Sequence, residues 1–243
     1  MSTPDAPATI HALLARIAED PVLAALLAEA RARDAALAVP DPAHDTAHLL
    51  RVALWTLRLG AAEAAGAGGA EPLDPQEAVA AALLHDAVHV PKDSPDRARA
   101  SELAAEFATH RLATLGFAPD AVVRIAAAVR DHSFSRGAVP ADALGRALQD
   151  ADRLEALGAI GWLRCIATGV RMQAEWFHAD DPWAAARTLD DRRYSVDHLF
   201  TKLLGLPATM RTAAGRVEAE RRAAFLRAFA AQLGDELGAP PTR

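Results

Sequence analysis

The sequence predicts an all-α protein that folds as a single-domain helical bundle of about nine to eleven helices. Apolar residues recur at helical spacing along most of the chain, and no segment shows sustained two-residue alternation rich in β-branched residues. Pro, Gly and Asp residues separate the helical runs. With 243 residues, 51% of them hydrophobic, the chain can bury a sizeable core. We expect a helical extension over 1–40, a main domain over 41–237 and a flexible tail over 238–243.

The first helical run extends from Ile10 to about Arg33. Asp20 and Pro21 interrupt it, and they are typical of an N-cap followed by the first residue of a new helix. A connector then follows around Val39 to Pro42, because its two prolines exclude helix.

The next two helices end or begin in polar clusters. One begins near Asp45 or Thr46 and extends to about Ala65. The other begins at Asp74-Pro75 and ends at His85-Asp86. Burying an imidazole and a carboxylate without partners would cost several kcal/mol. A cation shared by the two side chains would remove this cost, and the alternative is a hydrogen-bonded helix terminus.

The second half of the chain continues the helical pattern. Gly116 is typical of the residue that follows a helix C-terminus. The stretch from Trp176 to Asp191 looks irregular. Helices are expected over about 96–115, 119–132, 142–157, 158–173, 196–204 and 207–237.

Composition excludes several classes of protein. The net charge of −6 argues against general binding to nucleic acid backbones. No apolar run approaches the roughly 18 to 20 residues that a membrane span needs, and no signal peptide is visible. A single cysteine, Cys165, excludes an internal disulfide framework and favours a small buried apolar side chain in a reducing compartment. We therefore expect a cytoplasmic protein.

Three polar clusters stand beside apolar sequence: His44-Asp45 with His48, His85-Asp86, and Asp150 with Asp152. Imidazoles and carboxylates without thiolates suit Mn²⁺, Mg²⁺, Fe²⁺, Co²⁺, Ni²⁺ or Zn²⁺, and they disfavour a cysteine-rich structural zinc site. Two histidines and two aspartates leave positions on a six-coordinate ion for water and substrate, which is typical of a catalytic metal.

The order and spacing of these clusters resemble the HD superfamily of metal-dependent phosphohydrolases, and most of all its YedJ-like bacterial subgroup. The likeness covers about Asp41 to Glu236. Glu155 stands where the subgroup often has Asp, and the loop around Gly66 to Gly69 looks longer than usual. The motifs that carry the resemblance are His44-Asp45-x-x-His48-x-x-Arg51-Val52, Leu83-Leu84-His85-Asp86, His132-Ser133-Phe134-Ser135, Asp150-Ala151-Asp152-Arg153-Leu154 with the glycine-bearing stretch to Gly161, and His198-Leu199-Phe200-x-Lys202-Leu203-Leu204.

The resemblance implies an all-helical fold and one divalent ion, Mn²⁺ first among the candidates, held by His48, His85, Asp86 and Asp152. It also implies cleavage of phosphoester or phosphoanhydride bonds in a small phosphorylated molecule. A nucleoside triphosphate pyrophosphohydrolase is our first expectation, because that activity is known in the subgroup. The alternatives are a phosphomonoesterase, a phosphodiesterase, and a nucleotide-binding protein without turnover.

Further side chains are candidates for catalysis or substrate contact. Asp86, His132 and Lys92 are expected to take part in catalysis, although His132 could simply be favoured by a helix C-terminus. The candidates for contact with substrate are His44, Asp45, Arg51 and His89.

Several alternatives stay open at this point. His44 competes with His48 as the first ligand, and the Arg-Val that follows favours His48. Asp150 competes with Asp152, and the Ala-Asp-Arg-Leu context favours Asp152. Whether 176–191 forms a lid, and whether the chain forms a homodimer, is also left open.

Overall fold

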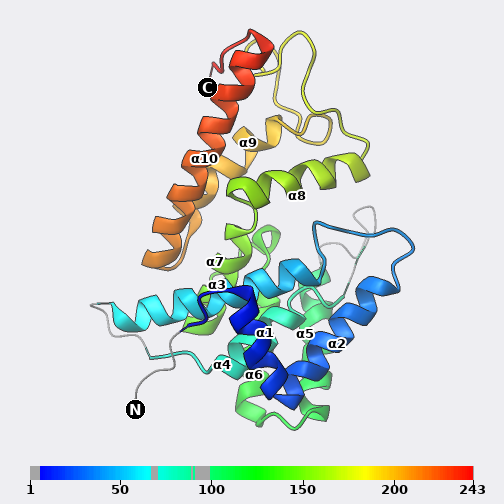
Figure 1. Ribbon diagram of the computed structural model, residues 1–243, viewed down its shortest axis with the longest axis vertical. Helices are drawn as coiled ribbons and strands as arrows, with labels where there is room; N and C mark the ends of the chain where they lie inside the picture. Colours follow the sequence, from blue (N-terminus) through cyan, green and yellow to red (C-terminus); the bar gives the residue numbers. More distant parts are fainter. Residues whose placement is uncertain (1–5, 67–70, 89, 91–98, 243) are drawn as a thin grey trace. The chain divides into compact units, whose positions relative to one another are not determined.

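The computed structural model describes residues 6–66, 71–88, 90 and 99–242, and these residues form ten α-helices joined by loops and short 3₁₀ turns (Figure 1). The β pairing found among them is an isolated bridge between Glu175 and Tyr194. The prediction of an all-α fold with nine to eleven helices is therefore confirmed. The chain divides into two compact units, Met1–Asp152 and Arg153–Arg243.

In the first unit, α4 lies at the centre of the packing. It contacts α2, α3, α5 and α6, and every residue from Ala78 to Leu84 is buried. This apolar helix therefore carries the residues that follow it into the interior of the unit. The helices of the unit are α1 (Ile10–Glu19), α2 (Pro21–Ala35), α3 (Thr46–Ala65), α4 (Pro75–Leu84), α5 (Ala100–Thr114), α6 (Pro119–Asp131) and α7 (Ala143–Leu154), which ends just past the boundary, with the 3₁₀ turn η2 (Phe134–Arg136) between the last two.

Aspartates fix three helix starts in this unit, as the sequence predicted. The side chain of Asp20 accepts hydrogen bonds from the first turn of α2, that of Asp45 from α3, and that of Asp74 from α4. Such caps occupy backbone N–H groups that have no partner within the helix. Within the described residues α5 extends from Ala100 to Thr114, and its predicted start near Asp96 lies outside the described part of the chain.

The second unit is built around α10 (Ala213–Leu237), which packs against α8 (Gly158–Arg171) and the 3₁₀ segment η3 (Leu203–Thr209), and η3 in turn packs against α9 (Asp197–Thr201). The predicted start of the last helix near Pro207 is wrong, because Pro207 belongs to η3. The true start is set by Thr212, whose hydroxyl accepts a hydrogen bond from the N–H of Gly215 at 2.9 Å.

The predicted irregular stretch before α9 is confirmed, since no α-helix is described between α8 and α9. An ion pair between Arg187 and Asp197 connects this stretch to the first residue of α9. Arg187 donates two hydrogen bonds to the fully buried carboxylate of Asp197, at 2.6 and 2.7 Å, and its guanidinium also lies over the ring of Tyr194. Whether this segment closes over a ligand stays a prediction.

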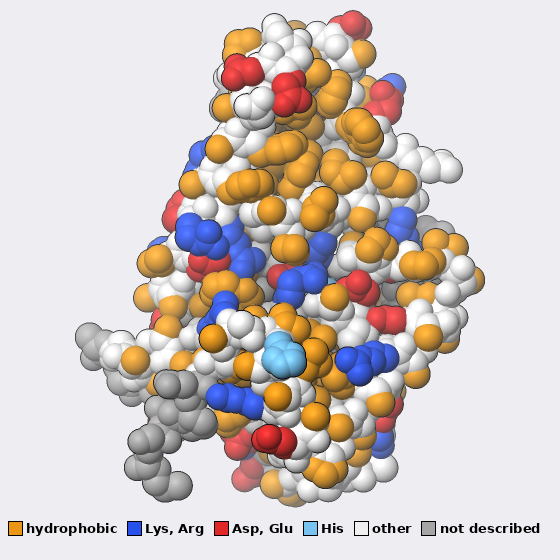
Figure 2. Space-filling view, in the orientation of Figure 1, with side chains coloured by type: hydrophobic (Ala, Val, Ile, Leu, Met, Phe, Trp, Pro, Cys, Tyr) orange, Lys and Arg blue, Asp and Glu red, His pale blue; other side chains and the backbone are white. Residues whose placement is uncertain are grey.

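Apolar side chains gather on the face of the second unit drawn in Figure 2, in the region of α8. Leu163 and Val170 on α8 and Trp176 beyond it are 66%, 62% and 63% exposed.

Within the described residues, no helix has both the length and the hydrophobicity that crossing a membrane requires. The homodimer stays a prediction.

Candidate metal centre

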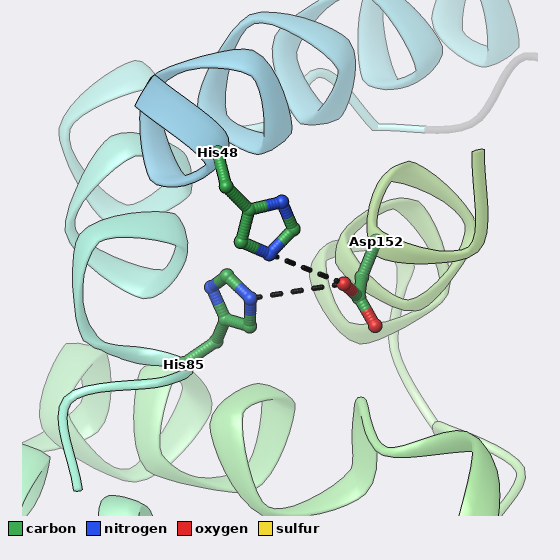
Figure 3. A group of neighbouring side chains, drawn as sticks. All are labelled: His48, His85 and Asp152. Carbon is green, nitrogen blue, oxygen red and sulfur yellow. Dashed lines mark ion pairs between the residues drawn. The ribbon is translucent and has the colours of Figure 1, made fainter. Parts of the chain in front are cut away.

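Three helices of the first unit bring the predicted ligands together. His48 is the third residue of α3, His85 is the C-cap of α4 and Asp86 follows it, and Asp152 lies on α7. Figure 3 shows the rings of His48 and His85 pointing toward the carboxylate of Asp152. Residues separated by up to about a hundred positions along the chain thus meet at one point, as a metal centre requires.

The facing atoms lie at closely similar distances. Oδ1 of Asp152 is 3.5 Å from Nε2 of His48 and 3.8 Å from Nε2 of His85. Oδ2 of Asp86 is 3.8 Å from Nε2 of His48 and 3.5 Å from Nε2 of His85. These separations are too long for good hydrogen bonds. They approach the roughly 3.0 to 3.5 Å between neighbouring ligands that each bind one ion at about 2.1 Å.

The tautomer of His85 also fits a metal ligand. Its Nδ1 lies 2.7 Å from the carbonyl oxygen of Ala82, which places the ring proton on Nδ1 and the lone pair on Nε2. That Nε2 is buried and has no hydrogen-bond partner among the described residues. A buried lone pair aimed at two carboxylates is accounted for by a cation between them.

The site is open on its carboxylate side. The side chains of His48 and His85 are fully buried, whereas those of Asp86 and Asp152 are 35% and 23% exposed. A cation held here would therefore be enclosed by protein behind the imidazoles and accessible to a ligand from the carboxylate side. The donor set is compatible with a divalent metal.

The charges of the site are mutually stabilised. Burial alone would raise the pKa of Asp86, but the imidazoles of His85, His132 and His48 hold this pKa well below its ordinary value. Burial likewise opposes ionisation of Asp152, yet the same histidines lower its pKa. Both carboxylates are thus ionised at neutral pH, as metal ligands must be.

His132 approaches Asp86 from a third direction. It is the C-cap of α6, it is 5% exposed, and its Nε2 lies 3.7 Å from Oδ1 of Asp86. Its Nδ1 lies 2.6 Å from the carbonyl oxygen of Val129. Burial lowers the pKa of His132, but the Asp86 and Asp152 carboxylates and the Val129 carbonyl raise it above its ordinary value. His132 can therefore hold a proton beside the candidate metal centre.

The predicted substrate contacts lie in different surroundings. His44 is partly exposed, with its Nδ1 3.1 Å from a carboxylate oxygen of Asp41, and its ring centroid is 6.3 Å from that of His48. Asp45 uses one carboxylate oxygen to accept the N–H of His48 at 2.9 Å. Arg51 is half-buried on α3. Their roles toward substrate stay predictions, and His89 and Lys92 lie outside the described residues.

The geometry distinguishes the competing ligands. Among the described residues, two groups of side chains are close enough to hold a cation, His48 with His85 and Asp152, and His85 with Asp86 and His132. Neither group includes His44 or Asp150. Asp150 is fully buried, two positions before Asp152 on the same helix. Successive helical positions point about 100° apart, so these two carboxylates face different ways.

Sequence reasoning missed two residues that support the site. The side-chain amide of Gln149 on α7 donates to the carbonyl oxygens of Asp131 and Ala138, at 2.8 and 3.0 Å, and so connects the loop after His132 to the helix of Asp152. Asp34 on α2 accepts the backbone N–H of Thr46 at 2.6 Å. Gln149 stood beside the Asp150 cluster in the sequence, but nothing there linked Asp34 to α3.

Comparison with known proteins gives the family. The family model of the HD domain matches residues 46–157, which include all four predicted ligands. The protein YpgQ of Bacillus subtilis (strain 168) is 30% identical over 198 residues, covering 80% of this chain and 84% of YpgQ. The chain belongs to the HD-domain family. This confirms the resemblance that the sequence motifs indicated.

Solved structures of other HD proteins agree with this assignment. The crystal structure of Bacillus subtilis YpgQ in complex with ADP is similar with a TM-score of 0.65 and 25% identity, covering 88% of this chain and 96% of that one. A predicted HD-superfamily hydrolase from an uncultured Thermotogales bacterium is similar with a TM-score of 0.58 and 26% identity, covering 92% and 98%. The relatives are thus matched over nearly their whole length.

Proposed function

We propose that this HD protein is a metal-dependent phosphohydrolase that acts on a nucleotide, and that it releases pyrophosphate from nucleoside triphosphates. The observation that carries the proposal is the pairing of two buried imidazoles with two partly exposed carboxylates around one point. This arrangement leaves one side of a cation accessible, which a purely structural metal site does not require. The ADP complex of the similar YpgQ protein supports a nucleotide as the ligand.

In this proposal, four of the site residues bind the cation and His132 transfers a proton. His48, His85, Asp86 and Asp152 would hold the cation, Mn²⁺ first among the candidates. When bound, such an ion offsets phosphate charge and lowers the pKa of water bound to it. The carbonyl oxygens of Ala82 and Val129 keep the Nε2 atoms of His85 and His132 directed toward the site. His132, whose Nε2 lies 3.7 Å from Oδ1 of Asp86, would donate a proton from Nε2 to a leaving oxygen.

The test is a product analysis with the metal-loaded protein. The purified chain with Mn²⁺ is incubated with a panel of nucleoside triphosphates, nucleoside monophosphates and cyclic phosphodiesters, and the products are resolved by anion exchange and ³¹P NMR. The proposal predicts a nucleoside monophosphate and pyrophosphate in equal amounts. An Asp152→Asn variant should lose this turnover, which excludes a contaminating phosphatase.

Other outcomes would redirect or end the proposal. Release of orthophosphate alone would exclude pyrophosphohydrolysis and favour a phosphomonoesterase, and turnover of cyclic substrates alone would favour a phosphodiesterase. Tight nucleotide binding without turnover under any divalent ion would make the chain a nucleotide-binding protein. Melting of the fold on metal removal would indicate a structural metal.

A further inference from the structure

We propose that Asp34 is a positioning residue for the metal ligand His48, an inference that rests on the proposed metal-binding role of His48. Asp34 lies near the C-terminal end of α2, and its Oδ2 accepts the backbone N–H of Thr46 at 2.6 Å and the hydroxyl of the same residue. Thr46 is the first residue of α3 and His48 is the third. One carboxylate oxygen of α2 therefore holds the turn that presents the ligand.

Two carboxylates secure this turn, and they act differently. Oδ1 of Asp45 accepts the N–H of His48 at 2.9 Å. The backbone N–H groups of Thr46 and His48 lie in the first turn of α3 and would otherwise lack partners within the helix. Asp45 is the N-cap of α3, so its bond is local to that helix. Asp34 comes from a separate helix, so its bonds to Thr46 fix the first turn of α3 relative to α2.

The helix that carries Asp34 is itself fixed against the other ligand-bearing helix. α2 packs against both α3 and α4, and α4 ends at His85. Arg111 on α5 donates to both carboxylate oxygens of Glu29 on α2, with Nε at 3.0 Å from each. The contact of Asp34 with Thr46 is thus part of the framework that sets the position of His48 relative to His85.

This contact gives α2 a function at the site. Asp34 lies in the predicted extension over 1–40 and outside residues 46–157, the range that matches the HD-domain family model. Through Asp34 the extension therefore supports the turn of α3 that carries His48.

The first experiment measures Mn²⁺ affinity by isothermal titration calorimetry in the full chain, well below the melting temperature. Residues that support metal ligands typically contribute 10- to 100-fold to metal affinity. We expect Asp34→Ala to weaken Mn²⁺ binding by roughly tenfold or more, and Asp34→Asn to stay near wild type, because its amide oxygen can accept both bonds from Thr46. The absorption spectrum of the Co²⁺-loaded protein should change in Asp34→Ala and not in Asp34→Asn.

The matched control is Asp74→Ala. Asp74 caps α4 by accepting the N–H groups of Gln76 and Glu77 at 2.8 and 3.0 Å, at the end of that helix opposite His85. The Asp74→Ala variant loses bonds between a carboxylate and backbone N–H groups of a ligand-bearing helix, as Asp34→Ala does. A general loss of stability would therefore affect both variants. We expect its Mn²⁺ affinity and Co²⁺ spectrum to match wild type. Equal effects of Asp34→Ala and Asp74→Ala would overturn the proposal.

A second readout separates this inference from the proposed function. Hydrogen exchange over residues 44–50 of the metal-free protein should be faster in Asp34→Ala than in wild type, whether or not the chain hydrolyses nucleotides or binds Mn²⁺. If Asp34→Ala does not fold, Thr46→Val removes only the hydroxyl bond and should show a smaller change in the same direction. Unchanged exchange and unchanged affinity in the folded variants would refute a positioning role for Asp34.

Discussion

His85 and His132 occupy equivalent positions at the ends of α4 and α6. The Nδ1 of each ring lies close to the carbonyl oxygen three residues earlier, at 2.7 Å for His85 and 2.6 Å for His132. Their Nε2 atoms face opposite oxygens of one carboxylate, Oδ2 of Asp86 for His85 and Oδ1 for His132. His85 shares its oxygen with His48, whereas His132 lies on the other side of the carboxylate. The same anchoring thus serves two different positions at the site.

We expect substitution of these two histidines to separate metal binding from turnover. His85→Gln should abolish Mn²⁺ binding and activity together. His132→Asn should bind Mn²⁺ nearly as wild type does, while kcat falls about 100-fold or more, which is the usual contribution of a general acid. Calorimetry and steady-state kinetics on both variants provide the test. Loss of Mn²⁺ binding in His132→Asn would instead make His132 a ligand.

The pH dependence of the metal-free protein follows from Asp86 and His132. The pKa of Asp86 is lowered, so its stabilising contribution is present above its ordinary value of 3.8 and is lost as pH falls through the lowered pKa. The pKa of His132 is raised, so its contribution is complete below its ordinary value of 6.5 and is lost as pH rises through the raised pKa. Urea denaturation of chelator-treated protein from about pH 3 to about pH 9 should show stability falling on both sides of this window. His132→Asn should remove the loss at alkaline pH, and an identical alkaline decline in that variant would contradict the assignment.

Gln149 should matter for both stability and turnover. Gln149→Leu leaves the carbonyl oxygens of Asp131 and Ala138 without its amide, and each such loss in a buried site costs about 1–3 kcal/mol. Because these carbonyls flank His132, kcat should fall while Mn²⁺ affinity stays close to wild type. Denaturation curves and kinetics measured together check this. A variant with unchanged kcat would show that the loop does not position His132.

Gly158 should resist substitution because of its backbone conformation. Its φ is +69°, and an added Cβ would lie 3.3 Å from the side chain of Arg222. Gly158→Ala should therefore lower the free energy of unfolding by about 1–2 kcal/mol. Gly205→Ala is the control, since Gly205 has an ordinary φ and no neighbour within 4 Å of an added Cβ. Equal stability of the two variants would contradict this explanation.

Local signals explain why so much of the fold could be predicted. Asp20-Pro21 and Asp74-Pro75 combine a cap with a proline at the first helical position, and both mark true helix starts. Pro207 misled the prediction because proline also suits a 3₁₀ segment, while the weaker cap Thr212 begins the last helix. Helix starts are thus predictable where short-range chemistry decides them.

The candidate site was predictable in part. His48, His85, Asp86 and Asp152 belong to motifs whose order can be read along the chain, and the structure brings all four together. Asp34 and Gln149 could not be found in the same way, because their contacts depend on how α2 and the loop before α7 pack. Such supporting contacts join residues from different elements, and no sequence spacing encodes them.

In the proposed site, His48, His85, Asp86 and Asp152 together bind one divalent cation. Isothermal titration of Mn²⁺ into chelator-treated protein tests it most directly, with Asp152→Ala as the ligand variant and Asp180→Ala, at an exposed aspartate, as the control. We expect one ion per chain for wild type and Asp180→Ala, and binding weakened at least about tenfold in Asp152→Ala. Absence of saturable binding in wild type, or equal affinity in Asp152→Ala, would contradict it.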